Sequence, residues 1–357
     1  MHRVIGDSPT DAARDLEATP FTTDEAIACY RDLVRTRRFD ERALALQRRG
    51  WMSGYPPFEG QEASQVGAAR ALADDDWLVP TYRSNAMQIA RGVPMSDILL
   101  FRRGYPEYAS DHDLNVFPQS VPIATQLPHA TGLGMAADYA NDDSTAVLCY
   151  FGDGATSEGD FHEGLNFAGV FDAPVVFFCE NNDWAISMRR DRQTASATIA
   201  GKARAYGFEG VQVDGNDPLA VREVVGDALE DARRGSPVLV ESLTYRQGAH
   251  TTSDDPSRYR EERADLPEWQ TADPLERFET YLRDQGVLDD ELVAEIDADA
   301  EDELEAAVEV AEAEPEPNLE DVFDHVYEDL SPRLSAQKEW LEDFASDRDV
   351  GEGDLER

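Results

Sequence analysis

The stretch STAVLCYFGDGATSEGDFHEGLNFAGVFDAPVVFFCENN, residues 144–182, decides the fold of this chain. It reads as an apolar strand that ends in a glycine turn, then a helix, and then a second strand that is apolar throughout. Apolar strands that alternate with helices are typical of a parallel sheet covered on both faces. Ligands of such sheets bind beyond the carboxyl ends of the strands, where Gly152–Gly154 and Asn181–Asn182 fall.

The same alternation extends in both directions. Downstream we expect a helix, a strand, a helix and a strand at 199–207, 209–215, 217–235 and 236–248. Upstream we expect a long helix, a Pro/Gly turn with a second helix, and a short strand with a third helix at 22–50, 54–74 and 77–92. Thr22 or Thr23 can cap the long helix, and Gly50 follows its end.

Composition divides the chain into three segments. Residues 1–21 are acidic, contain Pro9 and Pro20, and are predicted to form a flexible arm. Residues 22–262 carry the α/β pattern, and residues 263–357 are predicted to form an acidic C-terminal helical extension, with Pro315 and Pro317 between two helices. The sequence therefore predicts an α/β fold with a mostly parallel sheet, helices on both faces, and helical extensions at both ends.

The charge of the chain excludes some partners. Lys and Arg number 32 against 74 Asp and Glu, for a net charge of −42. Such a field repels nucleic acid and anionic membrane surfaces, so neither is an expected partner. The acidic residues are spread along the whole chain, which fits an organism with a salty cytoplasm, such as a halophilic archaeon, where ions screen the repulsion.

Several features indicate a cytoplasmic protein. Cys149 and Cys179 lie in apolar strands and read as buried thiols of a reducing compartment, and with Cys29 they form no disulfide framework or zinc spacing. The first twenty residues contain no apolar core of a signal peptide. No apolar run approaches the length of a membrane span.

The two strand ends predict a site for magnesium and a diphosphate. Gly152 and Gly154 allow a ligand to approach the backbone closely, and the N-terminus of the following helix attracts phosphate. Asp153 supplies a carboxylate oxygen and Asn182 a neutral one, and Mg²⁺ prefers oxygen ligands that it shares with phosphates. GDG alone is common in loops, but GDG and NN at successive strand ends with a helix between them is far more specific.

One other glycine pattern is a decoy. GLGMAA, residues 132–137, mimics part of a dinucleotide-binding fingerprint. The preceding QLPHAT contains Pro128 and is no core strand, so the context that the fingerprint needs is absent. We interpret these glycines as positions of close helix packing.

The 152–187 segment resembles the thiamine diphosphate motif of alpha subunits of 2-oxoacid dehydrogenases. The resemblance runs from about residue 24 to residue 345 and continues, in the expected order, in PTYRSNAMQIARG, SVPIATQLPHATGLGMAADYA and TYRQGAHTTSDDPSRYR. The last of these and the tail PNLEDVFDHVYEDL most resemble the branched-chain type. The resemblance implies a thiamine diphosphate-binding fold.

The resemblance also implies the contacts of the cofactor. Mg²⁺ would be bound by Asp153, Asn182 and the backbone carbonyl of Trp184. Cofactor-binding residues are implied at Tyr82, Arg83, Val121, Ile123, Gly152, Asp153, Gly154, Ala155, Asn182 and His250. In the branched-chain type a K⁺ site is formed by residues that match Ser120, Pro122, Thr125 and Gln126.

His250 is the expected catalytic residue. It follows the strand at 236–248 and opens a loop rich in hydroxyl and acidic side chains. A lone histidine is usually structural. By the resemblance this one lies beside the diphosphate and serves proton transfer or acylation of a lipoyl group. Arg246, Asp254 and Tyr259 match residues that order this loop, and Thr251 occupies the position of a regulatory phosphoserine in some relatives.

The resemblance implies oxidative decarboxylation of a branched-chain 2-oxoacid or pyruvate, with transfer of the acyl group to a lipoyl domain. The chain has room for the diphosphate-binding domain only, and the activating glutamate of this family comes from a beta subunit. We therefore expect an α2β2 heterotetramer that docks on a lipoyl acyltransferase.

Three alternatives stay open from the residues. An acetoin dehydrogenase alpha subunit shares the same motifs. A transketolase-like half is disfavoured by ATQLPHATG and RQGAHTTSDD, and a non-catalytic scaffold is disfavoured by the intact Asp153, Asn182, Tyr82, Arg83 and His250. The turn GYPPFEGQEA lacks the histidine of some pyruvate-type relatives, and Glu180 stands where animal branched-chain subunits have arginine. These departures leave the substrate open.

Overall fold

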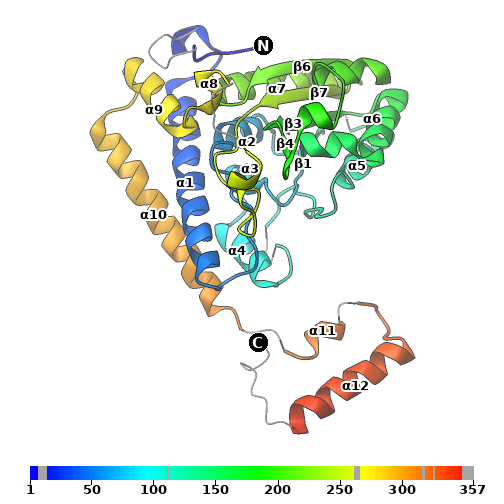
Figure 1. Cartoon of the computed structure of the whole chain (residues 1–357). Coiled ribbons are helices and arrows are strands. Elements are labelled where there is room, and N and C mark those ends of the chain that lie inside the picture. The colour runs from blue at the N-terminus through cyan, green and yellow to red at the C-terminus, as the bar shows by residue number, and fades with distance from the viewer. Residues whose placement is uncertain are drawn as a thin grey trace. The chain divides into compact units, whose positions relative to one another are not determined.

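The computed structural model describes residues 1–6, 14–108, 110, 112–142, 144–260, 266–315, 318–324 and 326–347. The chain divides into two compact units, Met1–Val308 and Glu309–Arg357. The first unit contains the sheet and the helices around it (Figure 1). None of the described helices is both long enough and apolar enough to span a bilayer.

A five-stranded parallel sheet forms the centre of the first unit. Its strands lie in the order β1 (Trp77–Val79), β2 (Val147–Gly152), β3 (Val175–Asn181), β7 (Val238–Leu243) and β6 (Glu209–Asp214). Every neighbouring pair is parallel. All residues of β3, and all of β2 before Gly152, are buried, as their apolar runs require. The predicted α/β class with a parallel sheet is confirmed.

Helices cover both faces of the sheet. On one face α5 (Gln126–Ala140) and α6 (Gly159–Phe171) insert Leu127 and Phe161 into a core with Cys149 and Phe177 of the central strands. On the other face α7 (Pro218–Arg233) packs against β3, β7 and β6, and α2 (Glu62–Ala69) packs against α7. The remaining helices before β2 are α1 (Thr23–Arg48), α3 (Asn85–Arg91) and α4 (Met95–Arg103). The segment predicted as a helix at 199–207 is a 3-10 helix at Ala200–Tyr206.

Close packing explains the decoy glycines in part. A Cβ added to Gly134 of α5 would lie 2.8 Å from Cγ2 of Val175, so this helix needs a glycine where it meets β3. A Cβ added to Gly132 would meet nothing within 4 Å. The packing interpretation therefore holds for Gly134 and not for Gly132.

The prediction of a flexible arm at 1–21 is wrong for residues 1–6. His2 pairs in parallel with Val213 at the edge strand β6, and Val4 and Ile5 are fully buried. The backbone N–H groups of Val4 and Ile5 donate to the carboxylate of Asp217 at 2.7 and 2.6 Å. Two apolar β-branched residues can extend the sheet edge, and the prolines and acids of the segment obscured this signal. Residues 7–13 lie outside the described part of the chain.

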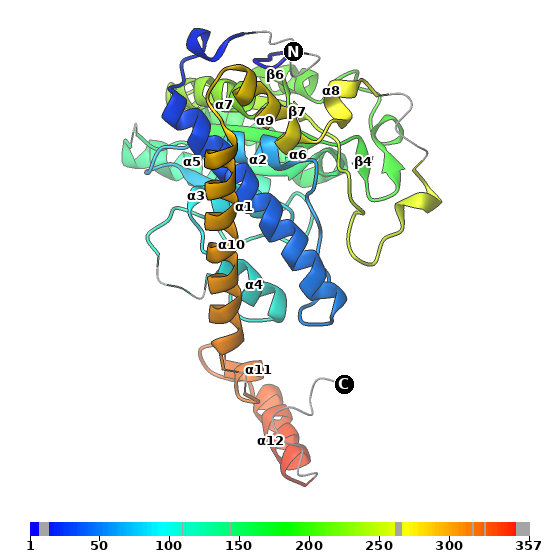
Figure 2. The ribbon, with the colours of Figure 1, turned by 90° about the vertical axis from the view of Figure 1, so that its left-hand side faces the viewer.

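The first unit also extends further than the predicted boundary at 262/263. After residue 265 the chain forms α8 (Glu268–Thr271), α9 (Pro274–Asp284) and α10 (Asp290–Ala313). The apolar face of α9 is buried, and α10 crosses α1 at an angle (Figure 2). Arg31, Arg35 and Arg38 of α1 pair with acidic residues of α10. The second unit holds α11 (Asp321–Asp324) and α12 (Pro332–Asp347).

Candidate active site

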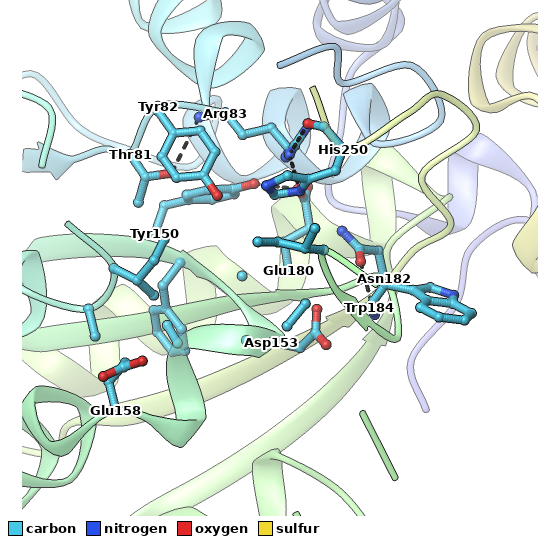
Figure 3. A pocket seen from close by; sticks show the side chains of 18 of the residues that line it. Thr81, Tyr82, Arg83, Tyr150, Asp153, Glu158, Glu180, Asn182, Trp184 and His250 are labelled. Atoms are coloured by element: carbon cyan, nitrogen blue, oxygen red, sulfur yellow. Dashed lines mark hydrogen bonds between the residues drawn. The ribbon is translucent and has the colours of Figure 1, made fainter. Parts of the chain in front are cut away.

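A cavity of about 300 Å³ lies beyond the carboxyl ends of β2 and β3, within the size range of small-molecule sites. Its walls come from five parts of the first unit: the turn after β1, the start of α5, the turn after β2, the turn after β3, and the loop after β7. Figure 3 shows Tyr82, Arg83 and His250 on one side of it and Asp153 and Glu158 on the other. Parallel topology thus brings together side chains that are far apart in the sequence.

Most of the predicted site residues line this one cavity. Those that line it are Tyr82, Arg83, Ser120, Ile123, Gln126, Gly152, Asp153, Gly154, Ala155, Asn182, Trp184 and His250. Val121, Pro122 and Thr125 do not line it. The side chain of Val121 is 56% exposed.

Asp153 is the least satisfied polar side chain of the site. It is 1% exposed, and neither carboxylate oxygen makes a well-formed hydrogen bond among the described residues, although the backbone N–H groups of Asn182 and Asp153 lie close enough to oppose the rise in its pKa. Burial, and next the nearby charge of Asp183, raise its pKa to about 7. A buried carboxylate without a partner is costly, and a bound cation would remove that cost. The site therefore fits a metal ion at Asp153.

Asn182 lies at the end of β3 with its amide held at both ends. Its Oδ1 accepts a hydrogen bond from the backbone N–H of Trp184 at 3.2 Å, and its Nδ2 donates to Oε1 of Gln61 at 3.4 Å. Trp184 begins a short hairpin of β4 (Trp184–Ala185) and β5 (Met188–Arg189). This hairpin packs on the glycine turn so tightly that a Cβ on Gly154 would lie 2.8 Å from Cβ of Ala185.

Arg83 links the turn after β1 to the loop of His250. Its Nη1 donates to the carbonyl of Pro57 at 2.6 Å, and its Nη2 donates to the carbonyl of His250 at 2.7 Å. Nη2 also lies 2.9 Å from Nδ1 of the His250 ring. A guanidinium can only donate, so Nδ1 accepts and the proton of the neutral ring lies on Nε2.

The loop after β7 is held by its own acids and rings. The backbone N–H of His250 donates to Oδ2 of Asp254 at 2.8 Å, and the hydroxyl of Tyr259 donates to the same oxygen at 2.5 Å. The ring of Tyr259 packs on that of Trp184 with centroids 5.5 Å apart. Asp254 and Tyr259 thus have the contacts expected of loop-ordering residues.

The Arg83 side of the cavity carries positive charge. Arg246 is buried beside Arg83, and burial followed by the charge of Arg83 lowers its pKa to about 10. Its Nη2 has no partner within the described ranges. Burial, Arg83 and Arg246 together lower the pKa of His250 to about 4, so its ring is neutral near pH 7. The cavity thus contains two guanidinium groups, which can bind an anion, and one buried carboxylate, which can bind a cation.

The segment at the start of α5 has the polar atoms of a cation site. The hydroxyl groups of Ser120 and Thr125 contact each other, and Oγ1 of Thr125 donates to the carbonyl of Pro122 at 3.0 Å. Nε2 of Gln126 donates to the carbonyl of Tyr150 at 3.0 Å, while its buried Oε1 has no partner in the described structure. Hydroxyl, carbonyl and amide oxygens are the kinds of donor that a hard cation takes.

Comparisons with known proteins agree with this geometry. The model of the family "Dehydrogenase E1 component" matches residues 30–320. The chain belongs to this family. The alpha subunit of 3-methyl-2-oxobutanoate dehydrogenase from Mycobacterium tuberculosis is 45% identical over 317 residues, which cover 87% of this chain and 85% of the relative.

Two pyruvate dehydrogenase relatives match a similar length. The E1 component alpha subunit of Bacillus subtilis is 38% identical over 326 residues, 90% of this chain and 87% of the relative. That of Staphylococcus aureus is 36% identical over 348 residues, 95% and 92% of the two chains. The E1 family is dependent on thiamine diphosphate. The predicted resemblance to alpha subunits of 2-oxoacid dehydrogenases, and the enzyme class that it implies, are confirmed.

Several wall residues of this E1 family member were not predicted as site residues. They are Thr81, Ala124, Tyr150, Phe151, Glu158, Glu180, Ala185, Ile186 and Arg246. Tyr150 and Phe151 end β2, so the rule that ligands bind at strand ends could have found them. Ile186 has a φ of 54°, which is rare for a β-branched residue and has no sequence signal.

The lowered pKa of His250 predicts how stability depends on pH. An unfolded chain protonates this ring below its ordinary value of 6.5, whereas the folded chain does so only near 4. The contribution of His250 to the free energy of unfolding is therefore fully present above pH 6.5 and is lost progressively as the pH falls toward 4. His250→Gln should give cofactor-free protein whose unfolding free energy, measured in urea between these pH values, falls less steeply. Parallel curves for the two proteins would contradict the assigned pKa.

Arg83→Lys should weaken cofactor binding although it keeps the charge. One ammonium group cannot donate to the carbonyls of both Pro57 and His250. The loop of His250 then loses its hydrogen bond to residue 83, and the positive group that would bind the diphosphate is no longer held in position. We expect thiamine diphosphate affinity, measured calorimetrically with saturating Mg²⁺, to fall roughly tenfold or more. Arg91→Lys on α3 outside the cavity is the control and should bind as the wild type does. If Arg83→Lys binds thiamine diphosphate with unchanged affinity, the two-armed guanidinium contact of Arg83 is not needed for cofactor binding.

Proposed function

We propose that this chain is the alpha subunit of a 2-oxoacid dehydrogenase that binds thiamine diphosphate and Mg²⁺ in the cavity. With a beta subunit it would decarboxylate a branched-chain 2-oxoacid and pass the acyl group to a lipoyl domain. One observation carries the proposal: the unpartnered carboxylate of Asp153 and the amide of Asn182 lie at adjacent strand ends, in the same cavity as Arg83 and His250.

The donor set suits magnesium bound to a diphosphate. In the described ranges no three His, Cys, Asp or Glu side chains cluster as a metal site of their own. An ion at Asp153 would therefore also use the oxygen of Asn182, the carbonyl of Trp184 and phosphate oxygens, which is the arrangement that Mg²⁺ favours. Arg83 and Arg246 would hold the phosphates. Thiamine diphosphate, when bound, supplies the electron sink for decarboxylation.

His250 can act as a proton donor at a defined atom. Arg83 holds Nδ1 as an acceptor, so Nε2 carries the proton of the neutral ring. The depressed pKa keeps this form dominant near pH 7. We propose that Nε2–H donates to an oxygen of the substrate or of the acyl group during transfer to the lipoyl arm.

The substrate that we propose is a branched-chain 2-oxoacid. The relative with 45% identity is named for 3-methyl-2-oxobutanoate, whereas the two pyruvate dehydrogenase relatives are 38% and 36% identical. The sequence of the loop from 244 to 260 resembles the branched-chain type as well. Pyruvate is the main competing substrate.

The cavity lies next to side chains that a beta subunit would cover. Ile123 and Ile186 line the cavity and are 45% and 54% exposed, and Val121, which precedes Ile123 by two residues, is 56% exposed. Exposed apolar groups at a site mark a contact surface. We propose an α2β2 heterotetramer docked on a lipoyl acyltransferase, with K⁺ at Ser120, Pro122, Thr125 and Gln126. Three buried free cysteines support action in the reducing cytoplasm.

The test is a substrate panel. The chain would be co-expressed with its beta subunit and assayed in high potassium salt with Mg²⁺ and thiamine diphosphate. Reduction of an artificial electron acceptor would be followed with pyruvate, three branched-chain 2-oxoacids, 2-oxoglutarate and acetoin. Activity with the branched-chain acids that is lost without the beta subunit supports the proposal. Activity with acetoin alone, or a pair that binds no cofactor, would overturn it.

A further inference from the structure

Asn182 can serve a metal ion only if its amide is turned the right way. The oxygen and nitrogen ends of an amide have nearly the same shape, so its hydrogen bonds decide which end faces the ion. With the nitrogen end toward the metal, the side chain would direct N–H donors at a cation. The groups that hold Nδ2 of Asn182 therefore belong to the metal site even though they do not touch the metal.

Gln61 is the group that holds this nitrogen. Nδ2 of Asn182 donates to Oε1 of Gln61 at 3.4 Å. Gln61 precedes α2, is completely buried and lies behind the wall of the cavity. Its own amide also needs an orientation, because Asn182 would meet a second donor if Gln61 were flipped.

Glu180 supplies the orientation of Gln61. Its Oε2 accepts hydrogen bonds from Nε2 of Gln61, from Nε2 of Gln65 at 3.3 Å and from the hydroxyl of Tyr150. Oε2 faces three donors, so if the carboxyl group of Glu180 is protonated, the proton lies on Oε1. Oε2 therefore accepts these hydrogen bonds in both protonation states. Nε2 of Gln61 is thus committed to Glu180, and only Oε1 is left for Asn182.

We propose that Gln61 is a positioning residue for the magnesium site, and that Glu180 fixes it. The relay from Glu180 through Gln61 holds Nδ2 of Asn182 away from the metal, and it acts together with the backbone N–H of Trp184, which donates to Oδ1 at 3.2 Å, to leave Oδ1 as the end that the metal meets. This inference rests on the proposed function, because the orientation matters only if a cation binds at Asn182. It also gives the buried carboxyl group of Glu180 a role in the metal site.

The test measures metal affinity and needs no turnover. In the assembly with the beta subunit, Mg²⁺ would be titrated at fixed thiamine diphosphate, and cofactor binding would be followed by quenching of protein fluorescence. Gln61→Leu keeps the volume and removes both hydrogen bonds. We expect its Mg²⁺ midpoint to rise about tenfold or more, as for other partners that orient metal ligands. Saturating Mg²⁺ should restore full cofactor occupancy, which it would not do for a misfolded site.

Variants of Glu180 separate the relay from general packing. Glu180→Gln retains an acceptor oxygen for Gln61 and should stay within about threefold of the wild-type midpoint, whereas Glu180→Leu should shift it as Gln61→Leu does. The double variant Gln61→Leu/Glu180→Leu should have a Mg²⁺ midpoint no higher than that of either single variant, because both substitutions break the same relay. Gln65→Leu is the matched control, since Gln65 donates to the same oxygen without contacting Asn182.

The outcomes distinguish this inference from the proposed function. Wild-type protein that binds thiamine diphosphate without any need for Mg²⁺ would overturn both. If Asn182→Ala abolishes the Mg²⁺ dependence and Gln61→Leu leaves the midpoint unchanged, the metal site stands and the positioning role falls. An equal shift in Gln65→Leu would likewise overturn it, because loss of packing would then explain the effect.

Discussion

Asp153→Ala should abolish magnesium-dependent binding of thiamine diphosphate while the protein stays folded. The carboxylate is buried without a hydrogen-bond partner in the described structure, and burial raises its pKa to about 7. Its removal deletes a group that is unfavourable in the empty site, so the cofactor-free variant should unfold at the same temperature as the wild type or higher. The loss of affinity should exceed the roughly 10- to 100-fold cost of removing a residue that only orients a ligand.

Thermal unfolding with and without Mg²⁺ and thiamine diphosphate checks this directly. Cofactor at about 100 times its Kd should stabilise the wild type by about 2.7 kcal/mol, and this gain should vanish in Asp153→Ala. Asp183→Asn is the matched control: this nearby carboxylate pairs with Arg190 and does not line the cavity, so its removal changes the local charge and not the proposed ligand. Full cofactor stabilisation of Asp153→Ala would show that the metal ligand is misassigned.

The strand ends were predictable because they follow from topology. Once β2 and β3 were expected to be parallel, Asp153 and Asn182 had to meet at the same edge of the sheet. Because one helix and one strand separate Asp153 from Asn182, the pattern was specific for a site at two successive strand ends. His250 also follows a predicted strand, so the same rule placed it at this edge, whereas the role of His250 and the place of Arg83 in the site came from the resemblance.

The relay behind Asn182 could not be predicted. Gln61 lies more than a hundred residues before Glu180 and Asn182, and the helix that it precedes packs mainly on α7. Three buried amide or carboxyl groups satisfy one another only in the folded arrangement. Residues 1–6 were missed for a related reason, since the edge of β6 that receives them is formed by residues 209–214.

The cavity separates two kinds of charge, which explains how one site can hold a metal and a diphosphate. Arg83 and the neutral His250 lie on one side in Figure 3 and Asp153 lies on the other, and Arg246 lines the same cavity close enough to Arg83 for the two charges to interact. Both guanidinium groups and the carboxylate are nearly inaccessible to solvent, so each interacts strongly with whatever lies between them. Neutralisation of both sides by a magnesium diphosphate couples binding of the metal to binding of the cofactor.

His250→Ala should lower turnover about 100-fold or more and leave cofactor binding nearly intact. Cofactor binding should survive because Arg83 donates to the backbone carbonyl of His250 at 2.7 Å, and alanine retains this carbonyl. The ring contributes the Nε2 proton, which alanine lacks. The loop keeps its own anchor, since the backbone N–H at position 250 still donates to Asp254. Steady-state rates with a lipoyl domain as acceptor, together with calorimetric titration of the cofactor, measure both quantities.

Thr251→Ala is the control for this prediction, because Thr251 belongs to the same loop and, among the described residues, its hydroxyl accepts a backbone hydrogen bond from Ser253 at 3.4 Å and makes no other. It should retain both binding and turnover. If His250→Ala turns over at the wild-type rate, His250 is a structural residue of the loop. If it loses cofactor binding and turnover together, the ring supports Arg83 more than the carbonyl does. Only loss of turnover with binding retained assigns the Nε2 proton to the reaction.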